Sequence, residues 1–92
     1  MKLILAIISD ELIAEVSKAL STSEFTTTKL SSTGGFRKKG NTTILVGVRA
    51  DEVNKCVNLI KQTIEKSDKR NPDDNVADAN IFVMPMMDMR KM

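Results

Sequence analysis

The sequence predicts an α+β fold with the element order βαββαβ. Two short apolar stretches rich in Ile, Leu and Val have the pattern of buried β-strands, at Lys2–Ile8 and Thr42–Val48. Two longer stretches place apolar residues every three to four positions, the period of a helix with one buried face. Two further strand-like stretches carry polar residues or a terminal proline, which is typical of sheet edges. This order is that of the ferredoxin-like arrangement, an antiparallel sheet with both helices on one face.

The N-terminal half is predicted to contain a central strand, a helix and an edge strand. Lys2–Ile8 is almost continuously apolar. Ser9 or Asp10 is a suitable N-cap for the next helix, because a short polar side chain accepts a hydrogen bond from the first free N–H groups. Phe25–Ser32 is rich in threonine and has polar residues on both faces, as an edge strand does. The apolar face of the helix would consist of Leu12, Ile13, Val16, Ala19 and Leu20.

The C-terminal half is predicted to supply the second central strand, a helix and the last strand. Asp51 opens the helix, and a polar connector at 67–77 separates it from the strand Asn80–Met84, which Pro85 ends. The first and third strands are the most apolar and are expected at the centre of the sheet. No repeat or second domain is visible, so we expect residues 1–92 to form one domain. The buried side of this helix would consist of Val53, Cys56, Val57, Ile60 and Ile64.

The central strands offer apolar side chains to both faces of the sheet, whereas the two predicted helices cover only one. Leu3 to Ile8 shows this most clearly, because its apolar residues do not alternate with polar ones. An exposed apolar sheet face would favour aggregation. We therefore expect the open face to be covered by self-association with other copies of the chain.

Composition argues against several classes of function. The net charge of +2 is too small to indicate nucleic acid or membrane binding by itself. RNA binding through the sheet is disfavoured because the central strands have Ile and Leu where stacking aromatics would be needed. No segment approaches the ~20 apolar residues of a membrane helix. The initial apolar run ends at Asp10 and is too short for a signal peptide, and the single cysteine, Cys56, fits a reducing compartment. We expect a cytoplasmic protein.

The residues needed for the commonest catalytic and metal sites are missing from the sequence. It has no histidine and one cysteine, which removes the usual general base, the common zinc ligand sets and a Cys-His nucleophile pair. The acidic pairs Asp10–Glu11 and Asp51–Glu52 are interpreted as helix N-terminal charges. We expect no catalytic residue, no metal site and no cofactor.

The loop at 34–40 has residues suited to an anionic ligand with a flat base. Adjacent N–H groups around Gly35 can converge on an anion, and Arg37 begins a run of three cations. Phe36 offers a stacking face, and the Asn41 amide offers a donor and an acceptor that suit an adenine edge. From composition alone, a solvated basic hairpin tip is an equally good interpretation.

Three stretches carry a resemblance to a known family: "MKLILAIISD", "TKLSSTGGFRKKGNTTILVGV" and "ANIFVMP". The chain resembles the PII-like cyclic di-AMP receptors of Gram-positive bacteria, most specifically in the middle stretch. The resemblance implies a ferredoxin-like PII-like homotrimer that binds cyclic di-AMP in pockets between neighbouring subunits, without catalysis. The trimer would cover the open sheet face.

The resemblance also implies roles for individual residues. Thr28 and the backbone around Gly35 and Phe36 would approach a phosphate. Asn41 and Gly47 would hold one adenine, Asn41 by its side chain and Gly47 by its backbone. A further pair of contacts would come from the C-terminal part, where Phe82 would pack on a base from the adjoining subunit and Lys91 occupies a base-contacting position.

The chain departs from the family pattern in three places. Thr26 stands where an arginine is common, and Lys91 stands where a glutamine is common. The connector at 67–77 is shorter than is usual in the family. The favoured hypothesis is a trimeric signalling protein that binds cyclic di-AMP, or a related adenine nucleotide, and relays it by loop rearrangement to an unknown protein partner. The alternative is a trimeric protein-interaction module of the same fold that has lost nucleotide binding.

Overall fold

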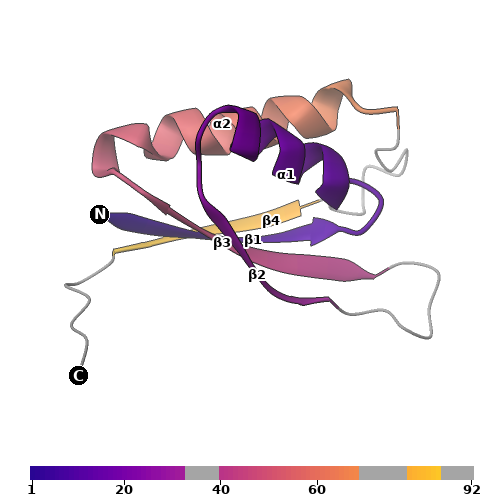
Figure 1. The fold of residues 1–92 in the computed structure, drawn as a ribbon, viewed down its shortest axis with the longest axis horizontal. Coiled ribbons are helices and arrows are strands. Elements are labelled where there is room, and N and C mark those ends of the chain that lie inside the picture. The colour runs from indigo at the N-terminus through magenta and orange to yellow at the C-terminus, as the bar shows by residue number, and fades with distance from the viewer. Residues whose placement is uncertain (33–39, 69–78, 86–92) are drawn as a thin grey trace.

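The computed structural model describes residues 1–32, 40–68 and 79–85, and it confirms the predicted element order. Both helices lie on the same side of a single sheet (Figure 1). A short 3-10 helix, Ala50–Glu52, leads into the second α-helix. The strands and α-helices are β1 (Lys2–Ser9), α1 (Ile13–Thr22), β2 (Thr27–Ser32), β3 (Asn41–Val48), α2 (Val53–Lys66) and β4 (Ala79–Pro85).

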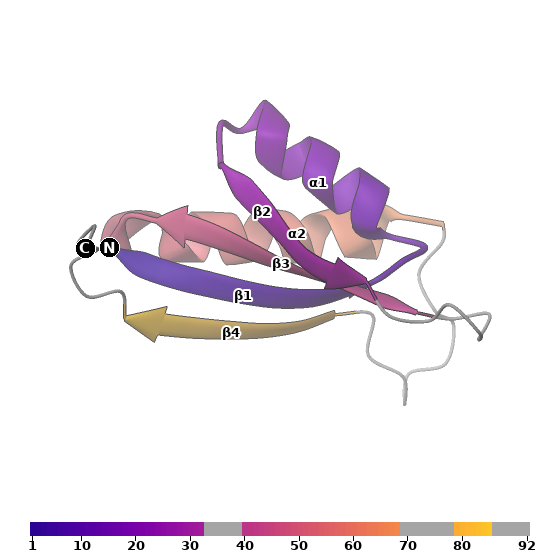
Figure 2. The same ribbon diagram turned by 60° about the horizontal axis from the view of Figure 1, so that its bottom comes forward.

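The sheet has the strand order β2-β3-β1-β4, with every neighbouring pair antiparallel (Figure 2). The prediction that the first and third strands are central is therefore confirmed. The registers are set so that Leu5 at the middle of β1 lies opposite Leu45 on β3 and Phe82 on β4. Because side chains alternate along a strand, residues paired in this way point to the same face.

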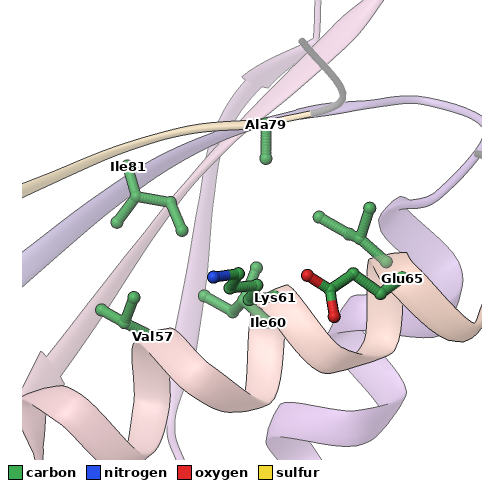
Figure 3. Close-up of a pocket in the computed structure, with 7 residues that line it drawn as sticks. Val57, Ile60, Lys61, Glu65, Ala79 and Ile81 are labelled. Carbon is green, nitrogen blue, oxygen red and sulfur yellow. The ribbon is translucent and has the colours of Figure 1, made fainter. Parts of the chain in front are cut away.

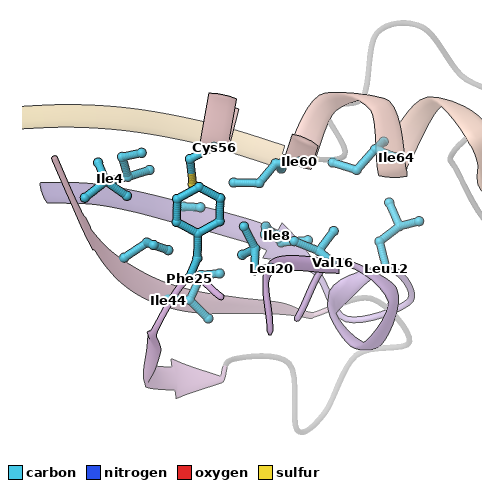
Figure 4. Close-up of a cluster of buried hydrophobic side chains, with 13 residues drawn as sticks. Ile4, Ile8, Leu12, Val16, Leu20, Phe25, Ile44, Cys56, Ile60 and Ile64 are labelled. Atoms are coloured by element: carbon cyan, nitrogen blue, oxygen red, sulfur yellow. The ribbon is translucent and has the colours of Figure 1, made fainter. Parts of the chain in front are cut away.

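The hydrophobic core lies between the sheet and the two helices (Figure 4). β1 contributes Ile4, Ala6 and Ile8, each with no exposed surface, and β3 contributes the alternate positions from Ile44 to Val48. Burying one aliphatic side chain of this size contributes about 1.5–3 kcal/mol to folding. The helices face them with Leu12, Val16, Leu20, Cys56, Ile60 and Ile64.

The predicted helix caps are wrong. α1 begins at Ile13, and its N-cap is Leu12, which makes no side-chain cap hydrogen bond. Ser9 is the last residue of β1, and its carbonyl accepts a hydrogen bond from the Leu12 N–H at 2.9 Å. The Asp10 carboxylate instead accepts a hydrogen bond from Thr42 on β3. Asp51 lies in the 3-10 turn, so that α2 begins at Val53 rather than at Asp51.

The turn between α1 and β2 also differs from the prediction, which placed Phe25 in the strand. Glu24 has a φ of 66°, in the left-handed region, and this reverses the chain after α1. Phe25 is 8% exposed, and its ring points into the core toward Cys56 (Figure 4). The Lys55 ammonium lies 5.8 Å from the ring centroid, a cation–π distance. β2 therefore begins at Thr27, after Phe25 has entered the core.

Cys56 gives the core a measurable dependence on alkaline pH. Burial, with a smaller contribution from the Glu52 carboxylate, raises the pKa of the Cys56 thiol from 9.0 to about 11. Between these pH values the unfolded chain loses a proton that the folded chain keeps, so the free energy of unfolding falls as pH rises.

We expect the wild-type protein to lose up to ~3 kcal/mol more stability than a Cys56→Ala variant across this pH window, since one pKa unit is worth ~1.4 kcal/mol. Urea unfolding of both proteins at the two ends of the window measures the difference. Every other effect of pH is common to the two proteins, so Cys56→Ala serves as the control. Equal losses in the two proteins would show that the thiol titrates normally in the fold.

Candidate functional site

The sheet face turned away from the helices is apolar, and we call it the open face. In the described part of the chain, β1 and β3 place half-buried aliphatic residues there, and β4 adds more exposed ones, with Phe82 53% and Met84 36% exposed. No described element covers this side of the sheet (Figures 1 and 2). Its apolar residues are Leu3, Leu5, Ile7, Leu45, Phe82 and Met84.

All four described residues of the predicted binding site lie on the open face. Thr28 pairs with Leu45, Gly47 pairs with Leu3, and Phe82 pairs with Leu5. Asn41 begins β3 and alternates with Thr42, which is buried on the helix side. The four residues are exposed, so a ligand approaching this face can reach each of them.

The structure does not gather these residues at one point. Thr28 and Phe82 are at opposite edges of one cross-strand row, three strand spacings apart, which is about 14 Å. Asn41 and Gly47 are near opposite ends of β3, and six residues of strand span about 20 Å. This distance exceeds the size of a purine. One adenine can therefore contact Asn41 and Gly47 together only if the two residues belong to different copies of the chain.

The other predicted site residues, Gly35, Phe36, Arg37 and Lys91, lie outside the described residues. Of the loop at 34–40, the structure describes Gly40. This glycine is buried, and its carbonyl accepts a hydrogen bond from the Asp10 N–H at 3.0 Å. The loop therefore rejoins the sheet at a fixed position, directly before Asn41.

The side chain of Asp10 has a partner that the sequence did not reveal. The Thr42 hydroxyl donates a hydrogen bond of 2.6 Å to the Asp10 carboxylate, across 32 positions of sequence. Thr42 is 2% exposed and occupies the same side of β3 as Ile44 and Val46. A lone hydroxyl among the buried positions of an apolar strand was the available signal, since buried polar groups are almost always hydrogen-bonded.

An apolar groove of about 280 Å³ lies between α2 and β4, on the helix side of the sheet (Figure 3). Its polar side chains, Lys61 and Glu65, are one helical turn apart on α2. None of the predicted site residues lines it, and the open face is on the other side of the sheet. Its lining residues are Val57, Ile60, Lys61, Ile64, Glu65, Ala79 and Ile81.

The described residues contain no cluster of three or more His, Cys, Asp or Glu side chains that could hold a metal ion. Cys56 is buried, and its raised pKa keeps the thiol protonated at neutral pH, which makes it a poor nucleophile. Among the described helices, none has both the length and the apolar character needed to cross a membrane. What the site offers chemically is therefore hydrogen bonding and apolar contact on the open face.

Comparison with known families decides the class of the protein. A family model described as Cyclic-di-AMP receptor matches residues 1–71, well over half of the chain. The chain belongs to this receptor family. The resemblance noted in the sequence is thereby confirmed, and with it the expectation of a nucleotide ligand rather than a cofactor. The matched segment of the receptor contains Thr28, Asn41 and Gly47, whereas Phe82 and Lys91 follow it.

A solved structure with the same fold supports the architecture over almost the whole receptor chain. The crystal structure of a functionally unknown protein from Pediococcus pentosaceus ATCC 25745 is 27% identical in sequence, with a TM-score of 0.75. The similarity covers 99% of this chain and 96% of the other. The ferredoxin-like prediction is confirmed by this match together with the observed strand order.

Two neighbouring threonines on β2 provide a matched test of which sheet face binds the nucleotide. We expect Thr28→Ala to weaken cyclic di-AMP binding by at least about tenfold, because a hydroxyl hydrogen bond to a charged group is worth ~1.5–3 kcal/mol. Thr27 pairs with the buried Val46 and points to the helix side, so Thr27→Ala should change affinity less than about twofold. Isothermal titration calorimetry measures both. A larger loss of affinity in Thr27→Ala than in Thr28→Ala would mean that the nucleotide does not bind on the open face.

Proposed function

We propose that this chain is a cytoplasmic, non-catalytic signalling receptor that binds cyclic di-AMP at junctions between copies of itself, most simply in a homotrimer. The observation that carries the proposal is the arrangement of the open face. Its exposed apolar surface needs a cover, and the described members of the predicted ligand set share that face, with Asn41 and Gly47 too far apart to hold one adenine within one chain. Association of copies meets both requirements.

Each part of the ligand has a suitable group in this proposal. The Thr28 hydroxyl and the backbone at Gly35 and Phe36 bind phosphate oxygens, and Arg37 adds charge-assisted hydrogen bonds. The Asn41 amide recognises an adenine edge. Phe82, half exposed on β4, packs against a base held by the neighbouring copy, and Lys91 lies near that base. Ligand binding rearranges the loop at 34–40 and so alters the surface offered to a protein partner.

A second candidate function is supported by one specific position. Thr26, where an arginine is common in the family, is exposed and uncharged at the start of the β2 region. With that cation missing, the same trimer could serve as a protein-interaction module without a nucleotide. The apolar open face would be covered equally well in this case, so the two candidates differ only in ligand binding.

Calorimetry and light scattering separate these possibilities. We expect light scattering to give three times the 10.2 kDa chain mass, and cyclic di-AMP to bind one molecule per chain. ATP and cyclic di-GMP serve as comparison ligands. A trimer that gives no heat with any of the three at tens of micromolar protein supports the interaction module. A monomer would remove the basis of both candidates.

Mixing two defective variants tests whether each site is shared between copies. Asn41→Ala removes the amide, and Gly47→Val fills the space beside the Gly47 backbone, so each variant alone should bind poorly. If the two residues of a site come from different chains, random mixed trimers regain about one quarter of the sites, because both intact residues must meet at one junction. The recovered stoichiometry is read by calorimetry on the co-refolded mixture. No recovery would mean that each chain builds its site alone.

A further inference from the structure

We propose that Asp10 and Thr42 form a clamp that positions Gly40 and Asn41 for ligand binding. The inference rests on the proposed function and names residues that hold its site in place. Neither residue belongs to the predicted ligand contacts. Both act through Asn41, the residue between the two points that the clamp fixes.

The clamp consists of two hydrogen bonds on either side of Asn41. The Asp10 N–H donates to the Gly40 carbonyl at 3.0 Å, and the Asp10 carboxylate accepts from the Thr42 hydroxyl at 2.6 Å. Asn41 itself lies opposite Ser9 in the register of β1 and β3. Asp10 is therefore hydrogen-bonded to both sequence neighbours of Asn41, to the backbone of Gly40 and to the side chain of Thr42.

The side-chain bond of the clamp is strong for its setting. Its acceptor is a carboxylate, and hydrogen bonds to charged groups are shorter and roughly twice as strong as neutral ones. Its donor is nearly fully buried, with Thr42 2% exposed, so water competes poorly for the hydroxyl. Asp10 would serve as a helix cap in its usual role at such a position, but α1 begins three residues later and has no side-chain cap. The carboxylate is committed to β3 instead.

The position of the clamp explains why it matters for binding. Asn41 is the first residue of β3, and strand ends fray more readily than strand centres. A backbone segment that must be ordered on binding lowers the affinity by the conformational entropy it loses. With Gly40 and Thr42 both held, the backbone of Asn41 is already fixed on the open face. The clamp thus improves binding by ordering the contact before the ligand arrives.

A second hydrogen bond of the same kind, elsewhere in the fold, provides the control for a purely structural role of the clamp. The Ser67 hydroxyl donates to the Glu15 carboxylate at 3.0 Å, joining the end of α2 to α1, and Ser67 is 8% exposed. This pair resembles the clamp in chemistry and burial but lies in the helix layer. Ser67→Ala is therefore the control for Thr42→Val, which removes the hydroxyl while keeping the shape.

The experiment compares cyclic di-AMP affinity, thermal unfolding and amide hydrogen exchange for wild type and five variants. We expect Thr42→Val and Asp10→Ala each to weaken binding about tenfold, with the double variant no weaker than either single one. Thr42→Ser keeps the hydroxyl and should bind within about twofold of wild type, as should Ser67→Ala. In the ligand-free protein, exchange should speed up at Asn41 and Thr42 in the clamp variants alone.

The outcomes separate this inference from the receptor role on which it rests. Binding by wild type and by Thr42→Val with equal affinity overturns the clamp and leaves the receptor role intact. An equal loss of affinity in Ser67→Ala also overturns it, because the effect would then come from general destabilisation. If wild type gives no heat with cyclic di-AMP, the receptor role fails and the positioning role fails with it.

Discussion

The structure depends on one constraint: the two central strands are apolar on both sides, but the helices cover only one side of the sheet. The alternation along β1 sends Ile4, Ala6 and Ile8 into the core and turns Leu3, Leu5 and Ile7 the other way. The first set is part of the hydrophobic core that stabilises the single chain. The second set has no cover among the described elements, and it shares its face with the exposed members of the candidate site. In the proposed receptor, folding and ligand binding are thus divided between the two faces of one sheet.

The parts of the fold that depend on periodicity could be predicted from the sequence. The strand order follows from the apolar character of β1 and β3, and the helix faces follow from the spacing of residues such as Val16 and Ile60. The parts of the fold that depend on contacts between residues far apart in the sequence could not be predicted. Asp10 looked like a helix cap because caps are recognised locally, whereas its hydrogen bond is to Thr42, 32 positions away. Similarly, Phe25 belongs to the core and not to β2, because the backbone of Glu24 adopts a left-handed conformation that a non-glycine residue rarely takes.

The family pattern that carries the candidate site could be recognised in the sequence, but the spacing of the site residues in the fold could not be predicted from it. The stretch from Thr28 to Gly47 carries the family pattern, and the family match over residues 1–71 agrees with it. The sequence of one chain gives no distances across the sheet, so Asn41 and Gly47 were expected at a single adenine. β3 holds them near its two ends. The register also shows that Thr28 and Phe82 are the two ends of one row through Leu45 and Leu5, a relation between four strands that no local pattern contains.

The beginning of α1 is tied to the chain at two distant places. Asp10, just before the helix, holds Gly40 and Thr42 at the start of β3, and Glu15, in its first turn, accepts the hydrogen bond of Ser67 at the end of α2. Gly40 is where the chain returns from the loop between β2 and β3, and Ser67 is where it leaves for the connector to β4. These two points are thus anchored to residues only five positions apart in the sequence, Asp10 and Glu15. This short piece of backbone is therefore a common attachment point for the start of β3 and the end of α2.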